Sequence, residues 1–145
     1  MHPYLQRSAS SLQRVPDALL LLGARIFPAA VFWQSGQTKV DGWQLNDTAL
    51  YLFQEEYRLP GLDPLLAAHI AAIAEHLFPL LLVLGLATRL SAFALLGMTL
   101  VIQCCVYPDA WPTHGTWAVL LLWLVARGPG AVSLDRLIFR RTPAR

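Results

Sequence analysis

The chain has 145 residues, of which 56% are hydrophobic and only 14% are charged. Soluble domains carry about 25% charged residues, so this composition indicates an integral membrane protein without a separate soluble domain. The formal net charge is +2, and the basic residues gather near the chain ends. That distribution indicates membrane topology rather than nucleic-acid binding.

Four apolar stretches follow a polar lead at residues 1–15. A helix needs about 20 apolar residues to cross a bilayer, and four spans are predicted at residues 16–35, 64–86, 90–107 and 113–126. Residues 48–57 and 133–139 have apolar side chains at helical spacing, which predicts short surface helices capped by Thr48 and Ser133. The predicted fold is all-α, an integral membrane four-helix bundle over residues 16–139 with a short surface helix between spans one and two.

Basic residues predict how these spans are oriented. With both termini in the cytoplasm, the cytoplasmic segments hold eight arginines, including those of the basic tail at residues 140–145. The opposite side then holds only Lys39 and Arg58. Because cytoplasmic loops of membrane proteins are enriched in arginine and lysine, this asymmetry predicts four spans with both termini inside.

Two charged residues, Arg25 and Glu75, fall inside predicted spans. Counted from the cytoplasmic side at 1.5 Å per residue, Arg25 lies about 14 Å deep and Glu75 about 16 Å deep. An ion pair between them would relieve two groups that are costly to bury alone. The pair has two interpretations: a structural clasp, or a catalytic site that handles a proton or a quinone headgroup.

Further polar side chains mark candidate binding sites. His76 follows Glu75 directly and is a candidate for a proton relay or a cofactor contact, together with Gln34 and Lys39 towards the outer surface. Cys104 and Cys105 lie in the outer third of span three, and His114 begins span four on the same side. The two cysteines are either ordinary packing residues or a redox-active thiol pair, or they form a soft-metal site for Cu(I) together with His114.

The order and spacing of several short motifs resemble the DoxX family of small four-helix bacterial membrane proteins. The matching residues are Arg25, Trp33–Gln34–Ser35–Gly36 with Lys39, Leu59–Pro60, Glu75, Gly85 with Thr88 and Arg89, Gly128–Pro129–Gly130, and Ser133–Leu134–Asp135. The resemblance implies a multi-pass protein of the bacterial inner membrane with an oxidoreductase-like role. Some members resemble the membrane subunit of a thiosulfate:quinone oxidoreductase.

Two functions follow as hypotheses. The first is a membrane subunit of a redox complex that passes electrons to quinone, with Arg25 and Glu75 lining the site. The chain has no cofactor-binding motif of its own, so a protein partner would bring the redox centre. The alternative is a non-catalytic membrane scaffold or a metal- or stress-handling module, in which Cys104, Cys105 and His114 hold Cu(I).

Overall fold

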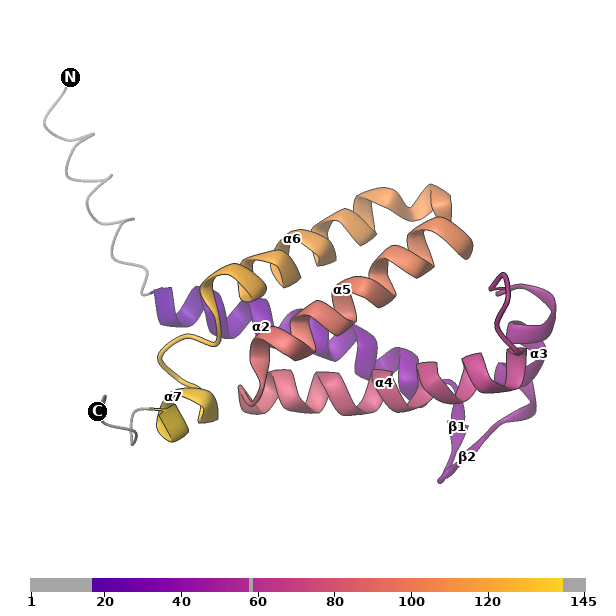
Figure 1. The fold of residues 1–145 in the computed structure, drawn as a ribbon, viewed down its shortest axis with the longest axis horizontal. Coiled ribbons are helices and arrows are strands. Elements are labelled where there is room, and N and C mark those ends of the chain that lie inside the picture. The colour runs from indigo at the N-terminus through magenta and orange to yellow at the C-terminus, as the bar shows by residue number, and fades with distance from the viewer. Residues whose placement is uncertain (1–16, 58, 140–145) are drawn as a thin grey trace, which may run out of the picture.

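The computed structural model describes residues 17–57 and 59–139. Its elements, in chain order, are α2 (Asp17–Gln37), β1 (Val40–Asp41), β2 (Gln44–Leu45), α3 (Asp47–Glu55), α4 (Pro64–Leu84), α5 (Thr88–Cys105), the 3₁₀ turn η1 (Pro108–Ala110), α6 (Trp111–Arg127) and α7 (Leu134–Phe139) (Figure 1). The predicted lead at residues 1–15, the basic tail at residues 140–145 and Arg58 lie outside the described residues.

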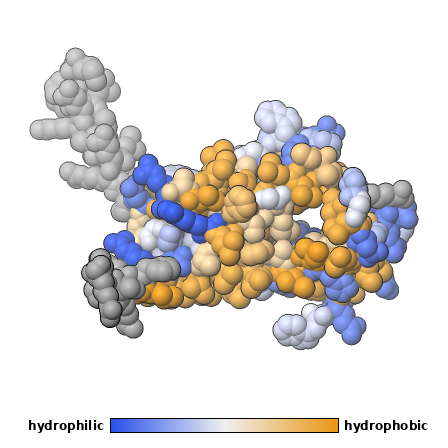
Figure 2. All heavy atoms as spheres, in the orientation of Figure 1, coloured by the Kyte–Doolittle hydropathy of each residue, from blue (hydrophilic) through white to orange (hydrophobic). Residues whose placement is uncertain are grey.

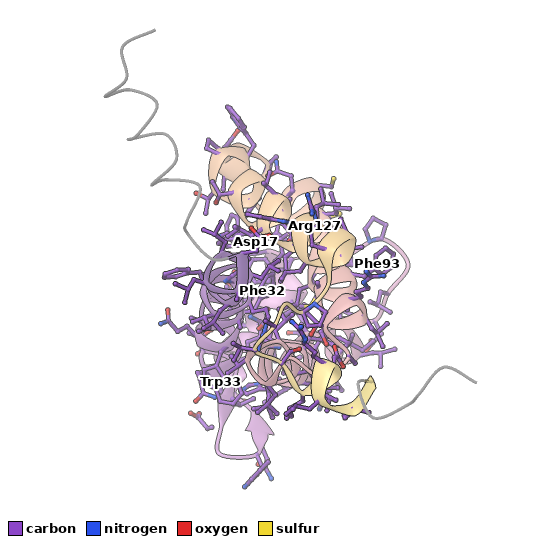
Figure 3. The ribbon with its side chains drawn as sticks, turned by 90° about the vertical axis from the view of Figure 1, so that its left-hand side faces the viewer. Asp17, Phe32, Trp33, Phe93 and Arg127 are labelled. Carbon is purple, nitrogen blue, oxygen red and sulfur yellow. The ribbon has the colours of Figure 1, made fainter. Side chains whose placement is uncertain are left out.

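The protein is mostly helical, and its four long helices lie side by side. Helix α2 packs against α4 and α6, and α5 packs against the same two helices. Phe32 lies between the helices, whereas Trp33 and Phe93 point outward (Figure 3). The core that these helices share consists mainly of leucine, alanine and Phe32.

The outer faces of the long helices are apolar. Side chains such as Phe27, Ile73 and Phe93 are more than 60% exposed. Hydrophobic side chains cover the middle of the molecule, and hydrophilic ones gather at its two ends (Figure 2). Helices α2, α4 and α5 are each long and apolar enough to cross a bilayer, and α6 has 17 residues. This arrangement confirms the prediction of a helical membrane protein, because proteins that are soluble in water rarely expose so much contiguous apolar surface.

Local signals set the ends of α4. The Asp63 side chain accepts a hydrogen bond from the backbone N–H of Leu66 at 3.0 Å, and Pro64 occupies the first turn, where its missing N–H is harmless. Gly85 ends the helix in the left-handed conformation, with φ of 68°. The predicted span at residues 64–86 therefore begins where expected and ends two residues early.

The segment between α2 and α4 differs from the sequence prediction. A two-stranded hairpin, in which Val40 pairs with Leu45, follows α2 and was not predicted. Asn46, not Thr48, caps α3: its Oδ1 accepts from the N–H of Ala49 at 2.7 Å. The choice of Thr48 was wrong because the hairpin presents Asn46 to the helix, and its amide also donates to the Thr38 carbonyl at 3.0 Å.

Helix α3 packs on the first part of α4. Phe53 is buried against Ala67 and Ala68, whose small side chains allow the close approach. At this end α5 and α6 diverge from α4 (Figure 1). The molecule thus has two distinct ends: one carries α7, and the other carries the hairpin and α3.

Candidate functional site

Arg25 lies at the end of the molecule that carries α7. It is 2% exposed, and its guanidinium donates to four backbone carbonyls. The acceptors are Leu82 at 2.7 Å, Val83 at 2.6 Å, Pro129 at 3.1 Å, and Val132. Two of these carbonyls belong to the last turn of α4, where the usual intrahelical donor four residues on is missing; that of Leu82 also accepts from the N–H of Gly85 at 3.0 Å.

The predicted ion pair between Arg25 and Glu75 is therefore wrong. Arg25 lies level with Leu82, which is seven residues or about 10 Å along α4 from Glu75. Arg25 also does not line the cavity on whose wall Glu75 lies. The depth estimate counted each residue from the end of its own helix and took those ends as level, but Arg25, eight residues after the start of α2, lies beside Leu82, only two residues before the end of α4.

Residues of the other motifs gather around Arg25. A Cβ on Gly85 would lie 2.6 Å from the Ser133 Cβ and 2.8 Å from the Arg25 guanidinium, so only glycine fits. The Asp135 carboxylate accepts from the backbone N–H groups of Ala87 at 2.8 Å and Thr88 at 2.9 Å, and so caps α5. These residues join the ends of three helices, which is a structural role.

Glu75 has a different partner, Lys39. The Lys39 Nζ lies 2.7 Å from Glu75 Oε2, and the two side chains are 12% and 4% exposed. Ser35 completes the cluster: its hydroxyl donates to Glu75 Oε1 at 3.3 Å and accepts from Lys39 Nζ at 3.0 Å. Within the described residues, Oε2 contacts Lys39 and has no other hydrogen-bond partner. It therefore keeps the capacity to accept one.

The turn after α2 brings Lys39 to Glu75. The N–H of Lys39 donates to the Gly36 carbonyl at 3.0 Å, and the N–H of Asn46 donates back to the Lys39 carbonyl at 3.0 Å. A Cβ on Gly36 would lie 2.8 Å from the His76 ring and 3.1 Å from the Glu75 Cβ, so glycine allows α2 to approach α4 here. The one lysine of the chain, placed just beyond α2, was the available sequence signal for this pair.

The Lys39–Glu75 pair lies on the wall of a cavity of about 480 Å³. The cavity is bounded by α2, α3, α4, α5 and α6, and most of its lining is apolar, including Phe32, Met98 and Trp117. Its polar lining residues are Ser35, Lys39, Tyr57, Glu75, Tyr107 and His114. The space-filling view shows the molecule hollowed at this end (Figure 2). Such a site suits a ligand that is mostly apolar and carries a polar head.

Two tyrosines connect the opposite sides of this cavity. The hydroxyls of Tyr57, next to α3, and Tyr107, after α5, lie 2.7 Å apart, and their rings meet edge to face. Burial, and then the hydrogen bond with Tyr107, raise the pKa of Tyr57 above its usual value, so its hydroxyl stays protonated at neutral pH. The two tyrosines thus contact each other at the end of the molecule where α5 diverges from α4.

His76 and Gln34, two predicted cofactor contacts, are not among the residues that line the cavity, whereas Lys39 is. His76 Nδ1 donates to the Ala72 carbonyl at 2.7 Å, and its Nε2 lies 2.9 Å from the side-chain nitrogen of Gln37. Its ring also packs edge to face on Trp33. Gln34 is exposed on α2.

The predicted metal residues are only partly together. Cys104 and Cys105 are free and exposed at the end of α5, while His114 is 5% exposed and lines the cavity. His114 Nδ1 donates to Gln103 Oε1 at 2.7 Å, which leaves Nε2 as an acceptor. Within the described residues, no group of three His, Cys, Asp or Glu side chains could hold a metal ion. The Cu(I) site stays a prediction that this arrangement does not favour.

Together these features define a small helical membrane protein with a buried ion pair on the wall of an apolar cavity. The chain belongs to the DoxX family, which matches residues 20–108, more than half of its length. It is also similar to a Haemophilus influenzae protein described only as uncharacterized, with 29% identity over 142 residues, covering 92% of this chain and 93% of that protein. No solved structure matches the chain.

Proposed function

We propose that this protein is the quinone-binding membrane subunit of a redox complex in the bacterial inner membrane. The observation that carries the proposal is the Lys39–Glu75 pair, nearly buried on the wall of a largely apolar cavity. Buried ionisable residues in membrane helices are costly and usually serve a function. A partner protein is expected to bring the redox centre, because the sequence has no common cofactor-binding motif.

The cavity residues fit the chemistry of a quinone. Apolar side chains such as Met98 and Trp117 would contact the ring and the isoprenoid tail. At the polar wall, Lys39 can donate to a quinone oxygen, and Glu75 Oε2, which contacts only Lys39 among the described residues, can accept from a quinol hydroxyl. His114 Nε2 provides a further acceptor from α6. A bound quinone would supply two-electron chemistry coupled to protons, and Glu75 would hold the exchanged proton.

The orientation of the chain decides which side of the membrane this site faces. We propose that α2, α4, α5 and α6 all span the bilayer with both termini in the cytoplasm, as the excess of arginine near the chain ends predicts. The cavity lies at the end opposite to α7. It would therefore open towards the periplasmic side, where a partner could reach it.

The test compares wild-type protein in detergent with Glu75→Gln and with Asp41→Asn. Asp41 is exposed on the hairpin, so its variant is a matched control for loss of one carboxylate charge. Decylubiquinone is expected to raise the melting temperature of wild type and the control, since a ligand at 100 times its Kd stabilises by about 2.7 kcal/mol. Glu75→Gln is expected to fold and to lose this response. No response in wild type, or an equal response in Glu75→Gln, would overturn the proposal.

A further inference from the structure

A second recessed site lies at the opposite end of the molecule, beside α7. It is a groove of about 810 Å³ lined by the beginning of α5, the end of α6 and α7. Each of these elements contributes one arginine, namely Arg89, Arg127 and Arg136. The view in Figure 3 faces this end and shows Arg127 on α6. Three separate helices thus bring positive charge to one groove.

The three guanidinium groups have no acidic partner among the described residues. The one ion pair found there joins Lys39 to Glu75 at the other end. Arg89 makes a single long contact of 3.4 Å with the Ala126 carbonyl. Asp135 also lines the groove, but its two oxygens already accept from the N–H groups that begin α5. The groove is therefore positive and has free hydrogen-bond donors.

The groove also has an unpartnered hydroxyl and an apolar border. Thr88 lines it, is 0% exposed, and its Oγ1 has no hydrogen-bond partner within the described residues. Leu90 and Ile138, also in the lining, are 64% and 54% exposed. The apolar surface of Leu90 continues along the outer face of α5 through Phe93, which is 65% exposed. An acyl chain could follow this face while a charged headgroup stays in the groove.

We propose that this groove binds the phosphate of an anionic phospholipid from the surrounding bilayer. Arginine is suited to phosphate because its planar guanidinium donates two parallel hydrogen bonds to phosphate oxygens. Anionic lipids attract clusters of basic residues at the cytoplasmic surface, and basic pockets between membrane helices bind such headgroups. The adjoining apolar face favours a lipid over a soluble phosphate, which has no acyl chain to bury. The site is independent of the proposed quinone cavity.

Titration of the purified protein with phosphatidylglycerol or phosphatidylcholine in mixed micelles tests this proposal, with binding read by native mass spectrometry and by thermal unfolding. Wild type is expected to bind one phosphatidylglycerol saturably and to show no such binding of phosphatidylcholine. The double variant Arg127→Gln/Arg136→Gln is expected to bind about tenfold more weakly or worse. Arg127→Lys/Arg136→Lys keeps the charge but loses the planar donors, so it is expected to lose part of the affinity.

A charge-matched control separates this site from a general charge effect. Gln44→Glu with Thr48→Glu changes the net charge by the same two units at exposed positions of the other end, and it should leave phosphatidylglycerol binding unchanged. Equal weakening in this control would overturn the proposal in favour of diffuse attraction. Equal binding of the two lipids would also overturn it. If inorganic phosphate alone stabilises wild type as strongly as phosphatidylglycerol, the groove binds a soluble anion and the lipid assignment is wrong.

Discussion

Replacing Arg25 with leucine tests whether this buried cation supports the fold or the chemistry. The side chain donates to four carbonyls that come from α4 and from the loop between α6 and α7. Leucine would keep some of the apolar packing and would remove all four donors. The Leu82 carbonyl would then keep only the N–H of Gly85 at 3.0 Å, and the Val83 carbonyl would lose its Arg25 donor.

The expected loss can be worked out from these contacts. The bond to the Leu82 carbonyl is fully buried, and hydrogen bonds to charged groups contribute about 1.5–3 kcal/mol each. The other three bonds are only partly buried, so water can replace part of their contribution, and about 1 kcal/mol each is expected. The total is about 4.5–6 kcal/mol, which corresponds to a fall in melting temperature of more than about 10 °C.

Thermal unfolding of the detergent-solubilised protein measures this loss. Arg89→Leu is the control, since Arg89 is exposed and makes only one contact of 3.4 Å, and its variant should change the unfolding free energy by less than about 1 kcal/mol. If Arg25→Leu unfolds like wild type but no longer responds to decylubiquinone, the structural interpretation of Arg25 is refuted. Loss of stability with a retained quinone response at low temperature would support it.

Two further predictions concern the turn after α4 and the closure of the cavity. Gly85→Ala should destabilise the protein by more than about 2 kcal/mol, because φ is 68° and the new Cβ would lie 2.6 Å from the Ser133 Cβ. The control Gly97→Ala, whose Cβ would have no neighbour within 4 Å, should be neutral or stabilising. Similar melting curves for the two variants would contradict this prediction. Tyr107→Phe removes the hydrogen bond to Tyr57, so the free energy of unfolding should fall by no more than about 1 kcal/mol. A quinone bound in the cavity should dissociate up to roughly tenfold faster in stopped-flow measurements. An unchanged dissociation rate would show that the tyrosine pair does not limit access to the cavity.

The sequence predicted the helices well because the signals that place them are local. Runs of apolar residues marked the long helices, and the N-cap Asp63 and the left-handed Gly85 set the ends of α4 within two residues. The motif residues Arg25 and Glu75 were recognised as buried charges from their position inside apolar runs alone. The hairpin between α2 and α3 was missed because strands of two residues carry no periodic pattern.

The partners of the two buried charges could not be predicted from local sequence patterns. Arg25 and Glu75 are 50 residues apart, and a depth counted along each helix separately does not show how far one helix is shifted past the other. Lys39 reaches Glu75 only because a hairpin turns the chain back at the end of α2 and because Gly36 lets α2 approach α4 closely. No local pattern contains this information.

The sequence by itself therefore determined a helical membrane protein of the DoxX family and the two charges that must be buried in it. Only the tertiary structure decided their roles. In it, Arg25 donates to backbone carbonyls at one end of the molecule, and Glu75 pairs with Lys39 on the wall of an apolar cavity at the other end. The physical reason is that helix formation depends on residues a few positions apart, whereas a buried charge is stabilised by whichever groups the packed helices bring within hydrogen-bond distance.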